Sequence, residues 1–335
     1  MAAQPLTEND AIITVENLEF SYGDFKAVDG ISFTVKKGEI FSFLGPNGAG
    51  KSTAINVLIT LLALQKGKAS VAGYDVTKDP QKVRESIGIV FQEITLDRDM
   101  TVWESLEFHG KLYSMPHTDR RNRIEELLTL VQLENKRDVR TKHLSGGMKR
   151  RLEIARGLMT RPKVLFLDEP TIGLDPQTRM RMWDYIKNVN KEGTTIFLTT
   201  HYMDEADQLS DQISIIDNGK IIISGTSWQL KNTLGQDIIY LETSDNDVAI
   251  QLIRNLSSVK DITTKSRGFL VSVNEDGTKV LPTIMERLHN AEIRIDTVNL
   301  KKPSMDDVFV HYTGKEIRDE PIGKSGFISL RPGGH

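Results

Sequence analysis

Cysteine is absent from the 335-residue chain. Its absence excludes disulfides, thiolate metal sites and cysteine nucleophiles, and it leaves the redox compartment open. Long hydrophobic runs are absent too, because the longest apolar helical stretch, 54–64, is about half of what a bilayer crossing needs. The chain is therefore expected not to span a membrane, so that any membrane role would come through a partner.

A strong excess of charge is also missing. The formal net charge of -3 gives no electrostatic reason to expect a nucleic-acid partner. The polar segment 1–10 lacks the basic and then apolar pattern of a secretory signal, which favours a cytoplasmic location. Hydrophobic residues make up 39% and charged residues 27%, as in globular proteins with a core. The length suggests one large domain or two smaller ones.

The first two thirds of the chain predict an α/β domain over 11–234. Continuous apolar strands are typical of a parallel sheet that is buried on both faces. Helical spacing over about 93–156 indicates a helical subdomain inserted into this frame. Asn218-Gly219 predicts a hairpin turn. The expected strands are 12–15, 31–35, 39–44, 87–91, 164–167, 195–199 and 212–216, with a helix over 53–64.

The chain beyond residue 234 predicts a second, smaller module over 236–313. Its pattern is strand, helix, strand, strand, helix and strand, which is the order of a ferredoxin-like α+β fold. The elements are expected at 238–242, 248–256, 259–264, 269–274, 278–291 and 293–300. The segment 314–335, rich in glycine, proline and charge, is predicted to be a flexible tail.

A glycine-rich loop joins the strand 39–44 to the helix 53–64. The glycines let backbone N–H groups turn towards phosphates, and the helix adds its positive N-terminal end. Lys51 is predicted to reach the β- and γ-phosphates and the Ser52 hydroxyl to ligate Mg2+. The pattern predicts binding and hydrolysis of ATP, although alone it leaves GTPases, kinases, helicases and transport ATPases open. It matches G-x-x-x-x-G-K-S with Gly45, Pro46, Asn47, Gly48, Ala49, Gly50, Lys51, Ser52 and Thr53.

Two carboxylates end the apolar strand 164–167. In a parallel sheet such a strand end lies where ligands bind. Asp168 is expected to hold Mg2+, and Glu169 to polarise the water that attacks the phosphate. An acidic strand end is also a common helix N-cap, but its pairing with the phosphate loop favours the catalytic interpretation.

A third element, Ser145-Gly146-Gly147, precedes a basic helix and offers a second anion site. One fold does not need two such sites for one triphosphate, so this site is predicted to meet a nucleotide held by another subunit. With Leu144-Ser145-Gly146-Gly147 and the phosphate loop, the segment 12–234 resembles the ATP-binding-cassette (ABC) ATPases. The resemblance implies a homodimer that sandwiches two ATP molecules head to tail.

The resemblance also implies roles for four further residues. Tyr22 would stack on adenine, and Gln92 would join the Mg2+ ligands Ser52 and Asp168 and link to a membrane partner. Asp175 would cross the dimer interface. His201 would contact the γ-phosphate and act with Glu169 and Lys51 in catalysis. The other histidines are interpreted as surface or packing residues.

One signature position departs from the family pattern. Met148 stands where glutamine is usual, and methionine cannot donate a hydrogen bond. Backbone donors and Ser145 carry the anion contact, so activity is expected to survive. A dimer contact made by that glutamine is not expected in this chain.

Within the family, the chain resembles the drug-exporter subgroup represented by daunorubicin-resistance ATPases. The resemblance implies a subunit on the cytoplasmic face of the membrane that powers a separate permease for drugs, lipids or other hydrophobic compounds. A soluble mechanical or regulatory ATPase of the same type is the alternative. The supporting phrases are 91–92, 96–97, 101–106, 150–152 and 303–309.

Overall fold

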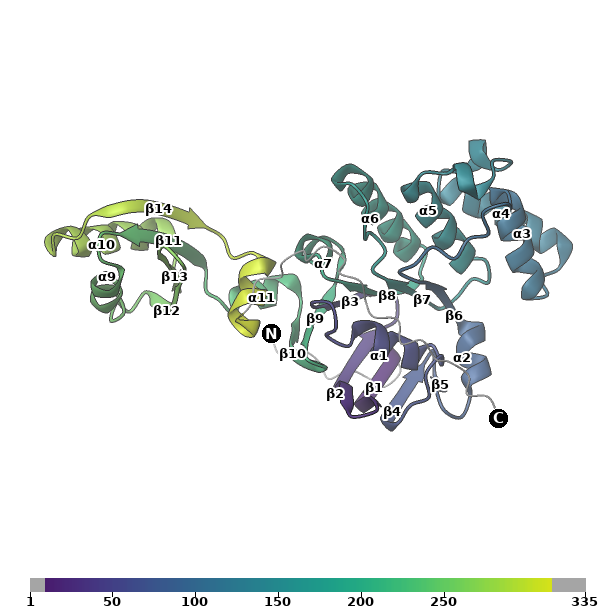
Figure 1. Cartoon of the computed structure of the whole chain (residues 1–335), viewed down its shortest axis with the longest axis horizontal. Coiled ribbons are helices and arrows are strands. Elements are labelled where there is room, and N and C mark those ends of the chain that lie inside the picture. The colour runs from purple at the N-terminus through teal and green to yellow at the C-terminus, as the bar shows by residue number, and fades with distance from the viewer. Residues whose placement is uncertain (1–9, 315–335) are drawn as a thin grey trace, which may run out of the picture.

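The computed structural model describes residues 10–314, which form an elongated molecule with two lobes (Figure 1). The N-terminal lobe runs from β1 to α8 and contains two sheets and most of the helices. The C-terminal lobe runs from β11 to β14 and contains one sheet. The predicted tail, from residue 315 onward, lies outside the described residues.

The central sheet of the N-terminal lobe has six strands in the order β10-β9-β3-β8-β7-β6. All neighbours are parallel except β10, which returns from β9 through the predicted Asn218-Gly219 turn. Every residue of β3, β7 and β8 is buried, which confirms the predicted parallel sheet. The strands are β3 (Ile40–Leu44), β6 (Ile87–Val90), β7 (Val164–Asp168), β8 (Thr195–Thr200), β9 (Gln212–Asp217) and β10 (Lys220–Gly225).

A second, antiparallel sheet packs against the first in the order β2-β1-β4-β5. Its two long strands are twelve residues each, longer than the sequence suggested, and the sequence did not indicate β4 or β5. Phe33 from this sheet joins Phe41, Phe43 and Phe197 of the central sheet in an aromatic core. The strands are β1 (Ala11–Tyr22), β2 (Phe25–Lys36), β4 (Lys66–Val71) and β5 (Tyr74–Asp75).

Helix α1 (Lys51–Leu58) is shorter than the predicted 53–64. The chain turns at Thr60, which has a φ of 66°, and the N–H groups of Leu61 and Leu62 both donate to the Asn56 carbonyl. Apolar spacing alone did not reveal this turn, because the residues beyond it still pack against the core.

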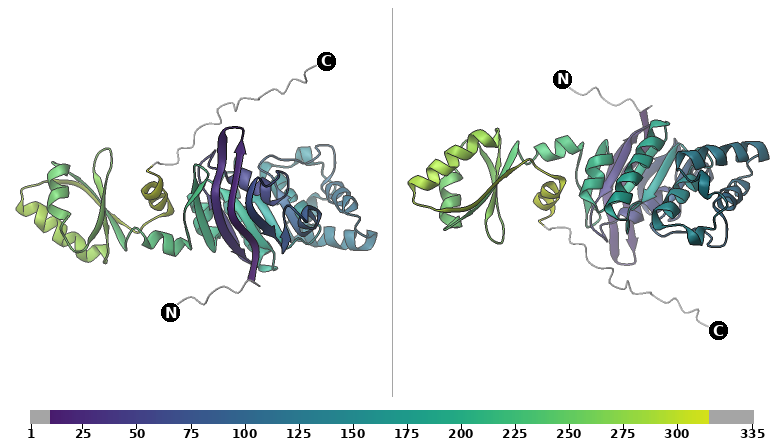
Figure 2. Two further views of the ribbon diagram at one scale, coloured as in Figure 1. Left: turned by 90° about the horizontal axis from the view of Figure 1, so that it is seen from below. Right: turned by 90° about the horizontal axis from the view of Figure 1, so that it is seen from above.

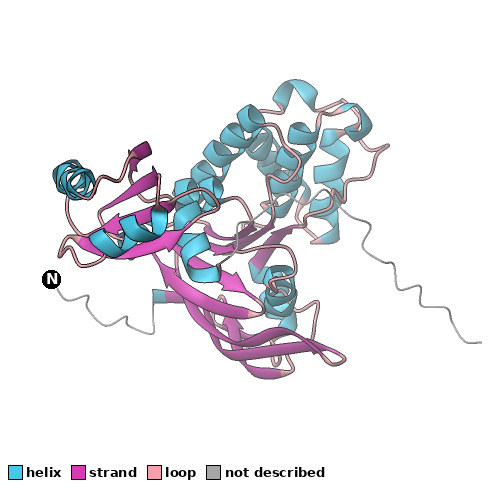
Figure 3. Ribbon diagram, turned by 60° about the vertical axis from the view of Figure 1, so that its left-hand side comes forward, coloured by secondary structure: helices cyan, strands magenta, loops and turns pink. Residues whose placement is uncertain are grey.

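The helical subdomain lies at the end of the molecule opposite the C-terminal lobe, beyond β6 (Figures 1 and 3). Thr101 and Glu104 form a capping box that starts α3, and Arg120 of α4 binds Glu107 of α3 through two hydrogen bonds of 2.8 Å. Besides α1, the helices of the N-terminal lobe are α2 (Pro80–Ser86), α3 (Val102–Leu112), α4 (His117–Leu130), η2 (Glu134–Lys136), η3 (Thr141–His143), α5 (Gly146–Gly157), α6 (Pro176–Lys191), α7 (Met203–Leu209) and α8 (Ser227–Asn232).

The C-terminal lobe has the predicted ferredoxin-like arrangement. Its antiparallel sheet has the order β12-β13-β11-β14, and α9 and α10 contribute to one buried core. The elements are β11 (Asp237–Thr243), α9 (Asn246–Ile253), β12 (Val259–Thr264), β13 (Phe269–Val273), α10 (Gly277–Asn290) and β14 (Ile295–Lys301). Within residues 10–314, no helix combines the length and the apolar character that a bilayer crossing requires.

The last described helix, α11 (Met305–Thr313), lies between the lobes beside α8 (Figure 2). Its apolar side packs on α7 and on the end of β3. Leu44, Met203, Leu230 and Phe309 belong to this junction cluster, which is separate from the core of the C-terminal sheet. After the C-terminal sheet, the described chain therefore returns to the N-terminal lobe.

Candidate nucleotide site

The phosphate loop connects β3 to α1 at the carboxyl edge of the central sheet. Gly48 and Gly50 have φ values of 81° and 100°, a region that other residues rarely adopt. A Cβ atom at Gly50 would also lie 2.4 Å from the Ala27 carbonyl oxygen. The glycines thus give the loop a tight turn, which presents the N-terminal end of α1 to a ligand.

Lys51 lies at the centre of this loop and is only 4% exposed. Its Nζ atom donates to the carbonyl oxygens of Gly45 (2.7 Å) and Pro46 (3.0 Å) and lies 3.3 Å from Glu169 Oε1. Burial lowers the pKa of Lys51, and the attraction of Glu169 offsets this only in part. A buried ammonium group ringed by oxygen atoms suits a position beside phosphate oxygens.

Ser52 and Asp168 lie together, as predicted, because α1 starts beside the end of β7. Ser52 Oγ donates to Asp168 Oδ1 over 3.1 Å, and Thr199 donates to the same oxygen. These are oxygen atoms of the kind that Mg2+ prefers. Among residues 10–314 no group of three or more Asp, Glu, His or Cys side chains could hold a metal, so an ion here would rely on hydroxyl and phosphate oxygens too.

Gln92, the third predicted metal ligand, forms no hydrogen bond with Ser52 or Asp168 in the described part of the chain. It follows β6 in a loop, its side chain is exposed, and it forms no side-chain hydrogen bond with the described part of the chain. Its carbonyl oxygen accepts from Arg150 Nη2 over 2.8 Å. Ser52 and Asp168 thus share a hydrogen bond, while Arg150 of α5 holds the loop that contains Gln92, whose role as a ligand stays a prediction.

Glu169 and His201 form a hydrogen-bonded pair at the ends of β7 and β8. The distance from His201 Nδ1 to Glu169 Oε2 is 3.0 Å. Glu169 has a φ of 48°, and its N–H donates to the carbonyl and the hydroxyl of Thr199, both at 3.1 Å. Burial alone would raise the pKa of Glu169, but the His201 hydrogen bond and the Lys51 charge outweigh it and leave this pKa below its usual value. Glu169 is therefore an ionised base at neutral pH.

The Ser145 turn and the Asp175 loop are neighbours. Ser145 caps α5 by accepting from the Met148 N–H over 3.3 Å, and Asp175 caps α6 by accepting from the Thr178 N–H over 3.0 Å. A Cβ atom at Gly147 would lie 2.5 Å from the Thr178 methyl, so glycine allows the two helix starts to approach. Both predicted dimer elements, including Gly146, thus lie side by side.

Tyr22 lies at the end of β1 with its side chain 51% exposed. Its ring meets Phe20 edge-on at 5.0 Å between centroids, which fixes one edge and leaves a face open. An exposed aromatic face of this kind can stack on a flat base.

Arg150 is a functional candidate whose place the sequence did not reveal. It belongs to the basic run 149–151 of α5, which on sequence alone could face solvent, but its side chain is buried. It donates to Glu153 Oε2 (3.1 Å) and to the carbonyls of Phe91 and Gln92, so it ties α5 to the Gln92 loop. Burial lowers its pKa, and the Glu153 charge opposes that effect. Only the helical spacing of the buried positions along α5 could have indicated that Arg150 links this helix to the Gln92 loop.

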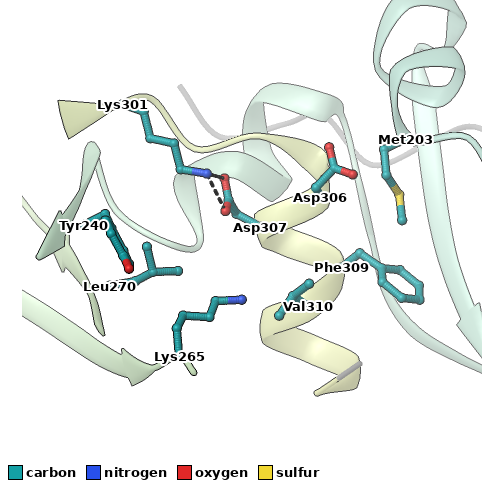
Figure 4. Close-up of a pocket in the computed structure, with 9 residues that line it drawn as sticks. All are labelled: Met203, Tyr240, Lys265, Leu270, Lys301, Asp306, Asp307, Phe309 and Val310. Carbon is teal, nitrogen blue, oxygen red and sulfur yellow. Dashed lines mark hydrogen bonds and ion pairs between the residues drawn. The ribbon is translucent and has the colours of Figure 1, made fainter. Parts of the chain in front are cut away.

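Two pockets lie outside the phosphate site. One, of about 230 Å³, lies where α3 meets the loop after β6 and includes Phe108, His109 and Leu112. The other, of about 440 Å³, lies between the C-terminal sheet, α11 and the start of α7 (Figure 4). Its lining includes Tyr240, Met203 and Lys301, whose ammonium pairs with Asp307 at 2.8 Å.

Comparisons with known proteins support the two-part organisation. Residues 28–172 match the ABC transporter family model, and residues 225–313 match the model of the C-terminal domain of DrrA1-3-like ATP-binding proteins. The daunorubicin resistance ATP-binding protein DrrA3 of Streptomyces coeruleorubidus is 39% identical over 92% of this chain and 98% of its own. The linearmycin resistance ATP-binding protein LnrL of Bacillus subtilis is 38% identical over 92% and 100%. The Nod factor export ATP-binding protein I of Ralstonia nicotianae is 35% identical over 92% and 95%.

Solved structures resemble the N-terminal lobe. CbiO1 from Clostridium perfringens, part of an ABC transporter complex, matches with a TM-score of 0.63 and 31% identity over 74% of this chain and 96% of that one. A dimeric ATP-binding cassette in a post-hydrolysis state, bound to ADP and Pi, matches with a TM-score of 0.57 and 27% identity over 64% and 98%.

Proposed function

Because the chain belongs to the ABC transporter family of ATP-binding proteins, we propose that it is the ATPase subunit of an exporter and works with a separate membrane permease. The observation that carries the proposal is the convergence of Lys51, Glu169 and His201 on one edge of the central sheet. Drug, lipid or another hydrophobic compound is the proposed cargo class. It rests on relatives named for resistance to daunorubicin and linearmycin.

Hydrolysis follows from the geometry of these three residues. The Glu169 carboxylate is ionised and accepts a hydrogen bond from His201, so it can orient and polarise a water molecule. Lys51 stabilises negative charge on the phosphates. Ser52, Asp168 and Gln92 would hold Mg2+. When bound, that ion supplies positive charge against the phosphate oxygens.

We propose that two copies close head to tail on two ATP molecules. In the described chain no hydrogen bond or ion pair joins the Ser145 turn to the phosphate loop of the same copy, and this turn offers unpaired N–H groups at the start of α5. The neighbouring Asp175 loop would face the second copy as well. Tyr22 would stack on the adenine of its own copy's nucleotide.

The permease is proposed to dock on the α3 pocket. Phe108 and Leu112 line this pocket. Their side chains are 50% and 64% exposed, which is a large exposed apolar surface for one helix turn. The pocket adjoins the loop of Gln92, and Arg150 links that loop to α5, which starts at the Ser145 turn. A segment of the permease seated here would therefore sense the closure of the dimer.

The residues 236–313 are proposed to be an accessory domain that regulates the ATPase. They contain no group of three Asp, Glu, His or Cys side chains that could hold a metal ion, and α11 contacts α7, which follows His201 directly. The junction cluster gives this domain a mechanical connection to the catalytic edge.

The substitution Glu169→Gln tests the catalytic proposal. We expect the variant to bind ATP, to lose turnover and to accumulate as an ATP-dependent dimer on gel filtration. Glu286→Gln, an exposed change of the same kind on α10, is the control. Normal hydrolysis by Glu169→Gln would remove this residue from its role.

Purification of the full chain from membranes tests the partner. A multi-helix permease should accompany the wild type and be lost with Phe108→Asp but kept with Met285→Asp, which alters another exposed apolar side chain. A chain that stays monomeric and soluble with ATP and Glu169→Gln would instead favour a soluble regulatory or mechanical ATPase.

A further inference from the structure

Glu205 is a fully buried acidic side chain for which the proposed catalytic roles have no use. It lies on α7 and is 0% exposed. Its Oε1 atom accepts from Thr171 Oγ1 over 2.8 Å and from Trp183 Nε1 over 3.1 Å. A buried acid costs free energy even when it is hydrogen-bonded, so its contacts must bring a compensating advantage.

The contacts of Glu205 join the same two segments as the catalytic pair. Thr171 lies two residues after Glu169, and Glu205 lies four residues after His201. His201 Nδ1 lies 3.0 Å from Glu169 Oε2, and Thr171 Oγ1 lies 2.8 Å from Glu205 Oε1, so two hydrogen bonds join the same two segments. A short turn, in which the Ile172 N–H donates to the Glu169 carbonyl over 3.2 Å, transmits the position of Thr171 to Glu169.

Trp183 extends this connection to a third segment. It lies on α6, whose first turn is capped by Asp175 in the loop proposed to face the second copy. One carboxyl group thus contacts the Glu169 loop, α6 and, through its own helix, the His201 segment. A change in any of the three would disturb hydrogen bonds to the same oxygen atom.

The second oxygen of the Glu205 carboxyl group lies in an unusual environment. Its Oε2 atom is buried and has no hydrogen-bond partner within residues 10–314. The guanidinium group of Arg179 lies 3.4 Å from Asp204 and 4.0 Å above the Tyr202 ring, its Nε atom is buried without a partner within residues 10–314, and its charge acts on Glu205. Burial raises the pKa of Glu205, and the neighbouring hydrogen-bond donors and the charge of Arg179 offset this only in part.

We propose that Glu205 is a positioning residue that holds the Glu169 loop against the His201 segment, so that the catalytic pair keeps its hydrogen-bonding distance. The inference rests on the proposed roles of Glu169 and His201. It assigns Glu205 no contact with ATP or with the attacking water. Its loss should therefore lower kcat and leave nucleotide binding nearly unchanged.

Three variants of the full chain test this inference. Glu205→Leu removes the acceptor, and Thr171→Val removes one donor with little change in shape. Each should lower kcat by about 10- to 100-fold, with the Kd for ATP within about threefold of the wild type. Glu205→Gln keeps a neutral acceptor and should retain kcat within about threefold. The double variant Glu205→Leu/Thr171→Val should be no slower than Glu205→Leu, because both remove the same contact.

Thr195→Val is the matched control. Thr195, like Thr171, is a buried threonine, but it lies on β8 at the strand end away from the catalytic pair. Its hydroxyl accepts from the Gly38 N–H over 2.9 Å. This variant should keep its kcat even where its melting temperature falls as far as that of Thr171→Val. Wild-type kcat in Thr171→Val and Glu205→Leu would overturn the inference, as would a loss in Glu205→Gln equal to that in Glu205→Leu. Should Glu205→Leu fail to fold, Thr171→Val and Glu205→Gln still decide the matter.

Failure of the inference is distinguishable from failure of the proposed function. If Glu169→Gln abolishes turnover while Thr171→Val does not lower it, the catalytic roles stand and only the positioning role of Glu205 falls. If Glu169→Gln hydrolyses ATP normally, the catalytic roles fail first.

Discussion

The two lobes differ in how their sheets bring side chains together. In the parallel central sheet the carboxyl ends of β3, β7 and β8 share one edge, with Leu44 opposite Thr200 and Asp168 opposite Thr199. Residues that follow these strands, far apart in sequence, therefore converge. In the antiparallel C-terminal sheet neighbouring strands end at opposite edges, so no comparable convergence arises. Topology, rather than the mere presence of charge, determines which lobe can carry the chemistry.

Ion pairs sharpen this comparison, because each lobe has one between a lysine and a buried carboxylate. Lys51 lies 3.3 Å from Glu169, and Lys302 lies 2.8 Å from the buried Asp237, which also accepts from the Gly277 N–H. The first pair faces the phosphate loop. The second fixes the start of β11 and α10.

The largest expected effect is that of Lys51→Met, which removes a positive charge beside the phosphates. We expect kcat to fall by about 100-fold or more, since preorganised charge stabilises the transition state. Lys302→Met removes a charge from the pair in the other lobe and should leave kcat within about twofold. Steady-state ATPase assays of both variants measure the difference. Equal losses in the two would show that catalysis depends on both lobes alike.

A second comparison concerns two buried phenylalanines. Phe309 lies in the junction cluster with Met203 and Leu44, whereas Phe269 lies in the core of the C-terminal sheet. Replacing either by alanine should cost about 3–5 kcal/mol of stability. Phe309→Ala should also speed hydrogen exchange in α7 and lower ATPase activity, because α7 follows His201. Phe269→Ala should affect only β11 to β14. Hydrogen exchange followed by mass spectrometry distinguishes the two, and identical exchange patterns would contradict a mechanical connection through α11.

The sequence predicted the parallel sheet and the ferredoxin-like order of the second lobe. The sheet follows from continuous apolar strands such as 164–167, and the order of the second lobe follows from the succession of strand and helix patterns over 236–313. The strand ends also predicted that Asp168 and Glu169 would meet the phosphate loop, because parallel strands end together. The roles proposed for the whole set of site residues remain predictions until variants are measured.

What the sequence did not indicate depends on contacts between distant segments. Helix α1 ends at Leu58 because the chain turns back onto Asn56, and no breaker residue marks that point. Arg150 and Glu205 carry charges that suggest a surface, yet tertiary packing buries both. Nothing in their neighbours along the chain reveals the partners that make burial tolerable, namely Gln92 and Thr171.

Histidines of the two lobes provide the smallest expected effect. Burial in the α3 pocket, with Arg156 nearby, lowers the pKa of His109 from 6.5 to about 4. The unfolded chain therefore takes up a proton at higher pH than the folded chain does, so stability is lost as the pH falls from 6.5 towards 4. Each pH unit in this window costs at most about 1.4 kcal/mol, because only one proton is taken up, and the partly open ring keeps the cost below that limit. His109→Gln should thus lose less stability on acidification than the wild type, with the exposed His289→Gln of the C-terminal lobe as the control. Urea unfolding between pH 7 and 4 measures the slopes, and the same slope for both variants would place the acid sensitivity outside the α3 pocket.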